Sequence, residues 1–369
     1  MKDSTDTGAV DTHGLPPTQL LERNVDRIQG ARLLLLGVPK DPKVVSLFRH
    51  QSGVLQSFDY GAHLLNAALL RAGGAGLAPV FAATCAPSEP RFDLVVAYLQ
   101  KGKEANDCLL STAGSVVSPG GRVILVGENA AGIRSFAARL EERVGPIEFS
   151  DAARHCVLYE ARSTGIRPEV RLEAWEKRFH AQTSSGGVDV VTLPGVFSHG
   201  RLDEGTAFLL PHLPPSVHGA VLDFGCGSGV IGAVIKSHSP GCEVSLVDSN
   251  AFALLAAERT FSVNGLAARA IRPVDGIDGV GDQTFDLIVS NPPFHQGIGT
   301  DYDVVGRFLQ QCEQRLNSGG VVLMVANRFL PYERMMPKAL QMSNVAENAK
   351  YKVLKGRLAP APRRARPRD

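Results

Sequence analysis

The chain has 369 residues, of which 44% are hydrophobic and 21% charged, and its formal net charge at pH 7 is +2. This composition is typical of a globular protein with room for two domains, and it excludes disordered and fibrous chains. The apolar runs are of strand length, below the roughly 18 residues of a membrane span, and the first residues lack the apolar core of a secretory signal.

The same series of apolar strands occurs twice along the chain. Phe-Asp-Leu-Val-Val at 92–96 returns as Phe-Asp-Leu-Ile-Val at 285–289, and each copy leads through a helical stretch and a Gly-Gly turn into another apolar strand. These later strands are predicted at 118–126 and 317–325, and earlier ones at 31–38 and 220–224. Because strands that alternate with helices are typical of a doubly wound sheet, we predict an α/β protein with two tandem Rossmann-like domains.

The two copies differ at the places where a ligand would bind. After its first strand the N-terminal copy has only Gly37-Val-Pro-Lys40, whereas the C-terminal copy has the glycine-rich segment 225–229. The segment Asn-Pro-Pro-Phe-His at 291–295 also has no counterpart in the first copy. We therefore interpret the N-terminal copy as a degenerate domain that has lost its cofactor site.

A Ser/Gly-rich break at 183–187 is the predicted linker between the domains. It divides the chain into a degenerate domain at 1–185, a second domain at 186–358 and a basic tail at 359–369. From residue 350 onward eight Lys and Arg stand against one acid, while the preceding part has 31 bases and 36 acids, a net charge of −5. Such a Pro- and Arg-rich end is expected to be disordered, and it either binds a polyanion through its phosphates or only keeps the protein in solution.

A glycine-rich loop joins a strand to a helical stretch in the second half. Gly225, Gly227 and Gly229 lie within Asp-Phe-Gly-Cys-Gly-Ser-Gly at 223–229. Glycines let the chain turn sharply and let a ligand approach the backbone. With Gly232 the loop also satisfies G-x-G-x-x-G, so a nicotinamide dinucleotide site remains open at this point.

Three acidic residues follow strands of this half. Asp223 ends the first strand, where a carboxylate can meet a cationic amino group, and Asp248 ends the next, where a carboxylate can accept both ribose hydroxyls. An amino acid joined to a nucleoside satisfies both acids, and S-adenosylmethionine is such a molecule. Asp275 follows a further short strand and could accept from an adenine amino group. The alternatives are a helix N-cap for Asp248 and a turn residue for Asp275.

Asn291-Pro292-Pro293-Phe294 directly follows an apolar strand, so it faces the crevice beyond the strand ends. Proline has no N–H, and its carbonyl is a pure acceptor. Together with the Asn291 side chain, these carbonyls can hold a planar NH₂ group toward a methyl sulfonium, while Phe294 stacks on the ring that bears the amine. We interpret these four residues as catalytic through positioning, with His295 as a further candidate proton acceptor and an ordinary Pro-Pro turn as the alternative.

These two motifs together resemble the bacterial ribosomal RNA guanine-N2 methyltransferases. Segment 192–198 resembles the segment that precedes that family's catalytic domain, and segment 325–332 resembles a later strand and loop of that domain. Segments 126–135 and 153–159 resemble its branch that acts on small-subunit 16S RNA, methyltransferase C. The resemblance extends from about residue 18 to about residue 358. Two segments depart from the pattern, namely the stretch before Asp275 and the Pro- and Arg-rich tail.

The resemblance implies a Rossmann-like fold, S-adenosylmethionine as the cofactor and a degenerate N-terminal domain that positions RNA. It implies cofactor contacts by Asp223, Gly225, Gly227 and Gly229 at the methionine end, by Asp248 at the ribose and by Asp275 at the adenine. It implies that the guanine is held by Asn291, Pro292, Pro293 and Phe294. The expected reaction is methyl transfer to the exocyclic N2 of a specific guanine in 16S ribosomal RNA of the 30S subunit, by a cytoplasmic monomer.

Several other functions stay open on the sequence. A 23S RNA enzyme of similar build, or an N-methyltransferase acting on DNA adenine or protein glutamine, would use the same chemistry. A nicotinamide dehydrogenase would explain the glycines but gives Asn291-Pro-Pro-Phe294 no role, and a non-catalytic RNA-binding or assembly protein would explain the empty N-terminal half. The six cysteines form no C-x-x-C pair, so we expect reduced thiols and no bound metal.

Overall fold

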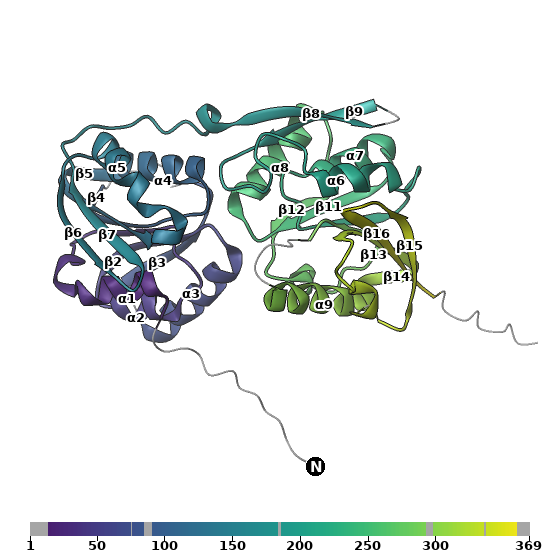
Figure 1. Ribbon diagram of the computed structural model, residues 1–369, viewed down its shortest axis with the longest axis horizontal. Helices are drawn as coiled ribbons and strands as arrows, with labels where there is room; N and C mark the ends of the chain where they lie inside the picture. The colour runs from purple at the N-terminus through teal and green to yellow at the C-terminus, as the bar shows by residue number, and fades with distance from the viewer. Residues whose placement is uncertain are drawn as a thin grey trace, which may run out of the picture. The chain divides into compact units, whose positions relative to one another are not determined.

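The computed structural model describes residues 14–74, 76–84, 91–183, 186–292, 298–335 and 337–359, with the backbone alone at 298–304. The chain divides into two compact units, Met1–Leu172 and Glu173–Asp369. Figure 1 shows that each unit consists of a sheet with helices on both of its faces.

The sheet of the first unit has seven strands among the described residues. They are β1 (Leu33–Leu36), β2 (Ser52–Ser57), β3 (Gly76–Phe81), β4 (Phe92–Tyr98), β5 (Val117–Glu128), β6 (Ile147–Ala153) and β7 (Cys156–Arg162). Their order across the sheet is β3-β2-β1-β4-β5-β7-β6, with β1 to β5 parallel and the last two antiparallel. The four leucines of β1 are fully buried because the central strand is covered on both faces.

The second unit repeats this arrangement. Its sheet contains β10 (Ala220–Phe224), β11 (Glu243–Asp248), β12 (Ala270–Pro273), β13 (Phe285–Ser290), β14 (Leu316–Asn327), β15 (Leu340–Glu347) and β16 (Tyr351–Leu358). The order β12-β11-β10-β13-β14-β16-β15 matches that of the first unit strand for strand. Parallel pairing of β10 to β14 and antiparallel pairing of the last two strands match as well. The prediction of two tandem doubly wound domains is confirmed.

Helices connect the strands. In the first unit they are α1 (Pro16–Arg23), α2 (Pro42–Phe48), α3 (Tyr60–Gly73), α4 (Lys103–Val116) and α5 (Ala137–Arg143). In the second unit they are α6 (Glu204–Leu209), α7 (Val230–His238), α8 (Ala251–Val263) and α9 (Ile298–Arg315). Of these, α2, α3, α6 and α8 begin at a polar side chain that caps them. Asp59 caps α3 by accepting from the Ala62 amide at 2.8 Å, and Asp203 caps α6 in the same way. In the described parts of the chain, no helix has the length and apolarity that crossing a membrane requires.

A hairpin precedes the second sheet. Its strands β8 (Lys177–Thr183) and β9 (Gly186–Thr192) pair antiparallel, with Thr183 opposite Gly186. The Val191 amide donates to the Thr260 hydroxyl on α8 at 3.0 Å, which fastens the hairpin to the second unit. The Ser/Gly-rich break therefore lies where β8 ends and β9 begins, within the second unit. The boundary between the compact units comes earlier in the chain, between Leu172 and Glu173.

Candidate active site

The strand order of the second unit places its crevice between β10 and β13. The chain passes from β10 to β11 on one side and from β13 to β14 on the other, and in open α/β sheets ligands bind beyond the strand ends at such a switch point. The fully buried Ser290 hydroxyl donates to the Phe224 carbonyl at 2.8 Å and joins the two strand ends. The glycine loop leaves β10 here and the Asn-Pro segment leaves β13, so both predicted motifs lie at one edge of the sheet.

The glycine loop contains three residues with left-handed backbone conformation, each separated from the next by one residue. Gly225, Gly227 and Gly229 have φ angles of 67°, 54° and 77°, which residues with a Cβ adopt only with strain. A Cβ added at Gly225 or Gly227 would meet no heavy atom within 4 Å, whereas at Gly229 it would lie 3.0 Å from the Ala257 Cβ. The first two glycines therefore border open space, and the third lets α7 pack against α8.

Asp223 carries an unsatisfied carboxylate oxygen inside the protein. The residue is fully buried, and its Oδ2 accepts from the Gly232 amide at 2.8 Å. Among the described residues no group donates to its Oδ1. The pKa of Asp223 is raised to about 7, chiefly by burial and also by the nearby charge of Asp248, while the hydrogen bond from Gly232 lowers it. A cationic donor placed at Oδ1 would remove both the unsatisfied acceptor and the cost of ionising it.

Asp248 organises the loop. Its Oδ2 accepts from the Gly227 amide and its Oδ1 from the Asn250 amide, both at 2.9 Å, and the residue is half-buried at the end of β11. The N-cap of α8 is Asn250, whose side chain accepts from the Phe252 amide at 2.8 Å, so the alternative role of Asp248 as that cap is wrong.

Asp275 lies at the same edge of the sheet. β12 pairs with β11 so that Pro273 stands opposite Asp248, and Asp275 follows two residues later with its side chain exposed. The structure thus places the three acids beyond adjacent parallel strands, in the order in which an amino acid, a ribose and a base follow one another.

Asn291 is held by side chains that the sequence analysis did not identify. Its Nδ2 donates to Asp203 Oδ2 at 2.9 Å and to Thr206 Oγ1 at 2.8 Å. Because both amide N–H groups are used, the carbonyl Oδ1 is the end of the side chain that remains to accept. The same Asp203 oxygen accepts from the Thr206 amide at 2.9 Å, so the start of α6 holds the acceptors in place. A helix cap at Asp203 is visible in the sequence, but its contact with a residue 88 positions away is not.

The remaining residues of this motif are described in part. Pro292, the residue that follows Asn291, is buried. Pro293, Phe294 and His295 lie outside the described residues, so their predicted roles stay predictions.

The described residues fit S-adenosylmethionine better than a dinucleotide. A pyrophosphate needs free amides at the start of the helix that follows a glycine loop, but the Gly232 amide there already donates to the Asp223 carboxylate. A second anion next to Asp223 would also be repelled. A cationic α-amino group, in contrast, matches the unsatisfied Asp223 Oδ1.

Comparisons with known proteins agree with this geometry. The family Methyltransferase small domain matches residues 187–355, and Methyltransferase small domain N-terminal matches residues 18–179. A Ribosomal RNA small subunit methyltransferase C of Shewanella sediminis is 37% identical over 347 residues, covering 93% of this chain and 98% of the relative. Its namesake in Shewanella loihica is 43% identical over 275 residues, covering 74% and 79%.

The chain belongs to the ribosomal RNA small subunit methyltransferase C family. A solved structure of the family, the T. thermophilus 16S rRNA N2 G1207 methyltransferase (RsmC) in complex with AdoMet and guanosine, is 25% identical, with a TM-score of 0.79. The similarity covers 93% of this chain and 92% of that one, so both units share its fold. The family expected from the sequence is therefore confirmed.

Within this methyltransferase C chain, the first unit has other residues where the second has its site. The matching strand registers set Leu35 at the position of Asp223, Ser57 at that of Asp248 and Tyr98 at that of Asn291. These three residues are buried, and the Tyr98 hydroxyl is hydrogen bonded to Thr18 at 3.3 Å. Each substitution removes a carboxylate or amide that the second unit presents to its crevice.

A side chain also fills the corresponding space of the first unit. Gln100 Nε2 donates to the Gly37 carbonyl at 3.0 Å and to the Tyr98 carbonyl at 2.7 Å, and so bridges the ends of β1 and β4. A Cβ at Gly37 would lie 2.5 Å from this nitrogen, whereas the equivalent Gly225 borders open space.

Proposed function

We propose that the protein transfers a methyl group from S-adenosylmethionine to the exocyclic N2 of a guanine in 16S ribosomal RNA. The observation that carries this proposal is the fixed Asn291 amide, whose acceptor end lies at the same sheet edge as the glycine loop and Asp223. Its support from outside the chain is the family, whose curated relatives are named as small subunit enzymes and whose T. thermophilus structure contains AdoMet and guanosine.

The cofactor is held by the acids and the open part of the loop. Asp223 Oδ1 receives the amino group, Asp248 the ribose hydroxyls and Asp275 the adenine amino group, while Gly225 and Gly227 leave space for the chain between them. Gly229 maintains the packing that shapes this loop. The chemistry that S-adenosylmethionine supplies is an electrophilic methyl group on a positively charged sulfur.

The acceptor guanine is oriented rather than activated. Asn291 Oδ1 and the carbonyls of Pro292 and Pro293 accept from the exocyclic amine, and Phe294 stacks on the base. No strong base is required first, because the amine proton becomes acidic only once the nitrogen carries the new methyl group. Catalysis then rests on holding the two reactants in line, which can contribute several kcal/mol.

The proposal also covers the ribosomal subunit that is modified, the cell compartment, the oligomeric state and the role of the first unit. We place the reaction on the 30S subunit, in the cytoplasm, with the protein acting as a monomer. The first unit binds no cofactor, because Leu35 and Gln100 occupy the place of the site, and it positions the RNA instead. The basic tail adds contacts to RNA phosphates.

The test compares isolated ribosomal subunits as substrates. Purified protein is incubated with methyl-labelled S-adenosylmethionine and either 30S or 50S particles, and the RNA is digested to nucleosides. We expect label in N2-methylguanosine from the 30S particles, and none from an Asn291→Ala control at the same protein concentration. Label from 50S particles alone, in protein or in DNA added to the mixture would overturn the proposal.

A further inference from the structure

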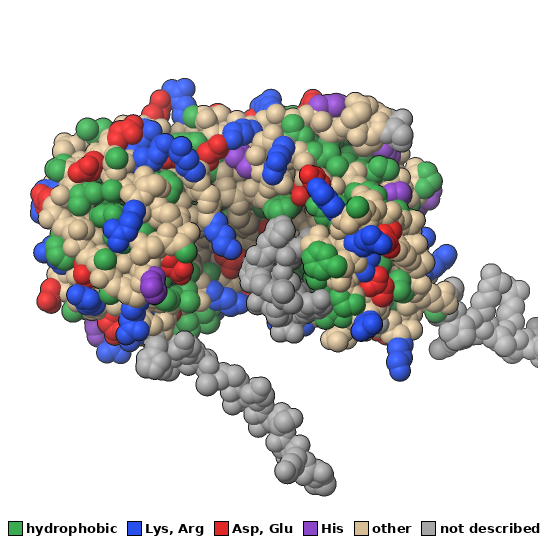
Figure 2. Space-filling view, in the orientation of Figure 1, with side chains coloured by type: hydrophobic (Ala, Val, Ile, Leu, Met, Phe, Trp, Pro, Cys, Tyr) green, Lys and Arg blue, Asp and Glu red, His purple; other side chains and the backbone are tan. Residues whose placement is uncertain are grey.

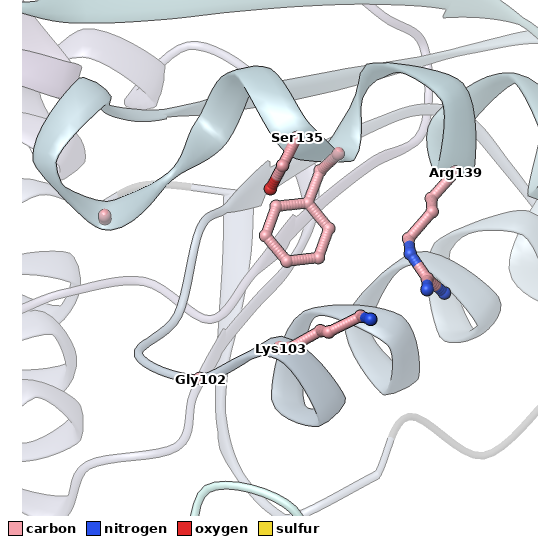
Figure 3. Close-up of a pocket in the computed structure, with 6 residues that line it drawn as sticks. Gly102, Lys103, Ser135 and Arg139 are labelled. Atoms are coloured by element: carbon pink, nitrogen blue, oxygen red, sulfur yellow. The ribbon is translucent and has the colours of Figure 1, made fainter.

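The first unit contains a cavity that the proposed function does not use. It measures about 490 Å³ and is lined by Gly102, Lys103, Ala131, Ser135, Phe136 and Arg139 (Figure 3). This volume is in the range of small-ligand sites, about 300–1,000 Å³. Gly102 and Lys103 begin α4, which follows β4. Ala131, Ser135 and Phe136 follow β5 in the segment that leads into α5, and Arg139 lies in α5. The cavity therefore opens beyond the carboxyl ends of β4 and β5.

Its position corresponds to the acceptor side of the second unit. In the repeat, β4 and α4 match β13 and α9, and β5 matches β14. The Asn291 segment lies between β13 and α9, so the cavity lies at the place in the first unit that corresponds to the Asn291 segment of the second. The other end, beyond β1, is filled by Gln100. The first unit has thus closed its cofactor side and kept an open acceptor side.

Two cations meet at this cavity. Figure 3 shows the Lys103 and Arg139 side chains pointing toward the same side of the cavity from two different helices. Lys103 is exposed and forms no ion pair within the described residues. One Arg139 nitrogen donates to Asp107 Oδ1 at 2.6 Å, which fixes the guanidinium while its other N–H groups remain available.

The rest of the lining is suited to a nucleotide. The Ser135 hydroxyl donates to the Gly132 carbonyl at 2.7 Å and keeps lone pairs that can accept from a base or a sugar. Phe136, 4% exposed, forms an apolar floor. On the face shown in Figure 2, basic and acidic side chains are interspersed.

We infer that this cavity binds a phosphate-bearing nucleotide of the RNA substrate, away from the target guanine. The inference rests on the proposed function only for the identity of the RNA. An acidic surface of a folded protein partner could also pair with these two cations. A concave site with two cations and an apolar floor, however, fits a single nucleotide better than it fits a protein surface.

The test measures RNA binding without any methyl transfer, so it stands apart from the test of the proposed function. Full-length protein is titrated against a naked 16S RNA transcript, in the absence of S-adenosylmethionine, at several salt concentrations. Lys103→Gln is expected to weaken binding about 3- to 10-fold and to lower the slope of log Kd against log salt by about 0.7 to 0.9, the share of one phosphate contact. Lys101→Gln, an exposed lysine two residues earlier and outside the lining, is the matched control and should leave both unchanged.

A second variant addresses the guanidinium. The double variant Arg139→Gln, Asp107→Asn removes the cation without leaving an unpaired carboxylate on α4, and it should weaken RNA binding in the same way while keeping affinity for S-adenosylhomocysteine. The inference is overturned if Lys103→Gln binds naked RNA with the affinity and salt slope of the unaltered protein. A defect seen with 30S particles but not with naked RNA would assign the cavity to a ribosomal protein, which also overturns it.

Discussion

Asn291 and Asp203 are joined by a 2.9 Å hydrogen bond across 88 residues, from the amide of one to the carboxylate of the other. Together with the bond to Thr206, this contact uses the amide N–H groups of Asn291 and leaves its carbonyl, which we propose accepts from the guanine amine. Asn291→Ala should therefore lower kcat about 100-fold or more and leave affinity for S-adenosylhomocysteine largely intact, because the lost group orients only the acceptor. Single-turnover methylation and calorimetric titration measure the two quantities. Equal losses in both would show that the residue shapes the whole crevice.

Thr206 should act on the reaction through Asn291. Its hydroxyl accepts from Asn291 Nδ2 at 2.8 Å. Thr206→Val removes this acceptor with little change in shape, and we expect kcat to fall about 2- to 10-fold, the worth of one hydrogen bond. Thr206→Ser keeps the hydroxyl and should restore kcat to near the original value. If Thr206→Val keeps the original kcat, the hydrogen bond to Asn291 does not contribute to the reaction.

Gly227 and Gly229 should respond differently to alanine. Both have positive φ, which costs about 1–2 kcal/mol for a residue with a Cβ. Only at Gly229 does the new methyl group approach Ala257, and overpacking adds about 1–3 kcal/mol. Gly229→Ala should thus lower the free energy of unfolding more, while Gly227→Ala should mainly weaken S-adenosylhomocysteine binding. Chemical unfolding and calorimetry separate the two effects, and the reverse order would contradict the assigned packing.

The raised pKa of Asp223 predicts that cofactor binding depends on pH. Its pKa in the free protein is raised to about 7 from the usual 3.8, chiefly by burial. Below this pH the carboxyl group is mostly protonated, and it must lose its proton before it can pair with a cationic amino group. Affinity for S-adenosylhomocysteine should rise between about pH 5.5 and pH 7 as Asp223 ionises. Asp223→Asn should remove this dependence and weaken binding, whereas Asp189→Asn, on an exposed acid of β9, should keep it.

The same shift affects stability. A folded-state pKa above the unfolded value means that the folded protein binds the extra proton between about pH 4 and pH 7. The free energy of unfolding of the free protein should therefore contain a component that falls as the pH rises through this window. Denaturant unfolding of the unaltered protein and of Asp223→Asn gives the comparison. An identical pH profile in the two proteins would show that Asp223 is already ionised when folded.

The sequence predicts those parts of the site that are local. Gly225, Gly227 and Asp223 belong to one short segment, and the repeat of Phe92 and Phe285 predicts the two sheets because strand patterns depend on neighbouring residues. Contacts between distant segments are not encoded in this way. The hydrogen bonds from Asn291 to Asp203 and from Gln100 to Gly37 depend on how strands and helices pack, and no local sequence pattern predicts them.

Two local patterns were ambiguous for the same reason. A Ser/Gly-rich segment is compatible with a linker between domains and with the connection of a hairpin. The pairing of Thr183 with Gly186 shows that here it belongs to a hairpin. Asp248 and Asn250 are both good helix caps, and only the direction of the chain after β11 gives that role to Asn250. The adenine contact of Asp275 remains a prediction.

The proposed function depends most on where the cofactor lies, and a crystal structure of the full chain with S-adenosylhomocysteine shows this directly. We predict the ligand in the second unit, with its amino group at Asp223 Oδ1, its ribose hydroxyls at Asp248 and its sulfur facing Asn291 Oδ1. A ligand bound in the first unit, or a crevice between β10 and β13 closed by the protein's own side chains, would contradict the account.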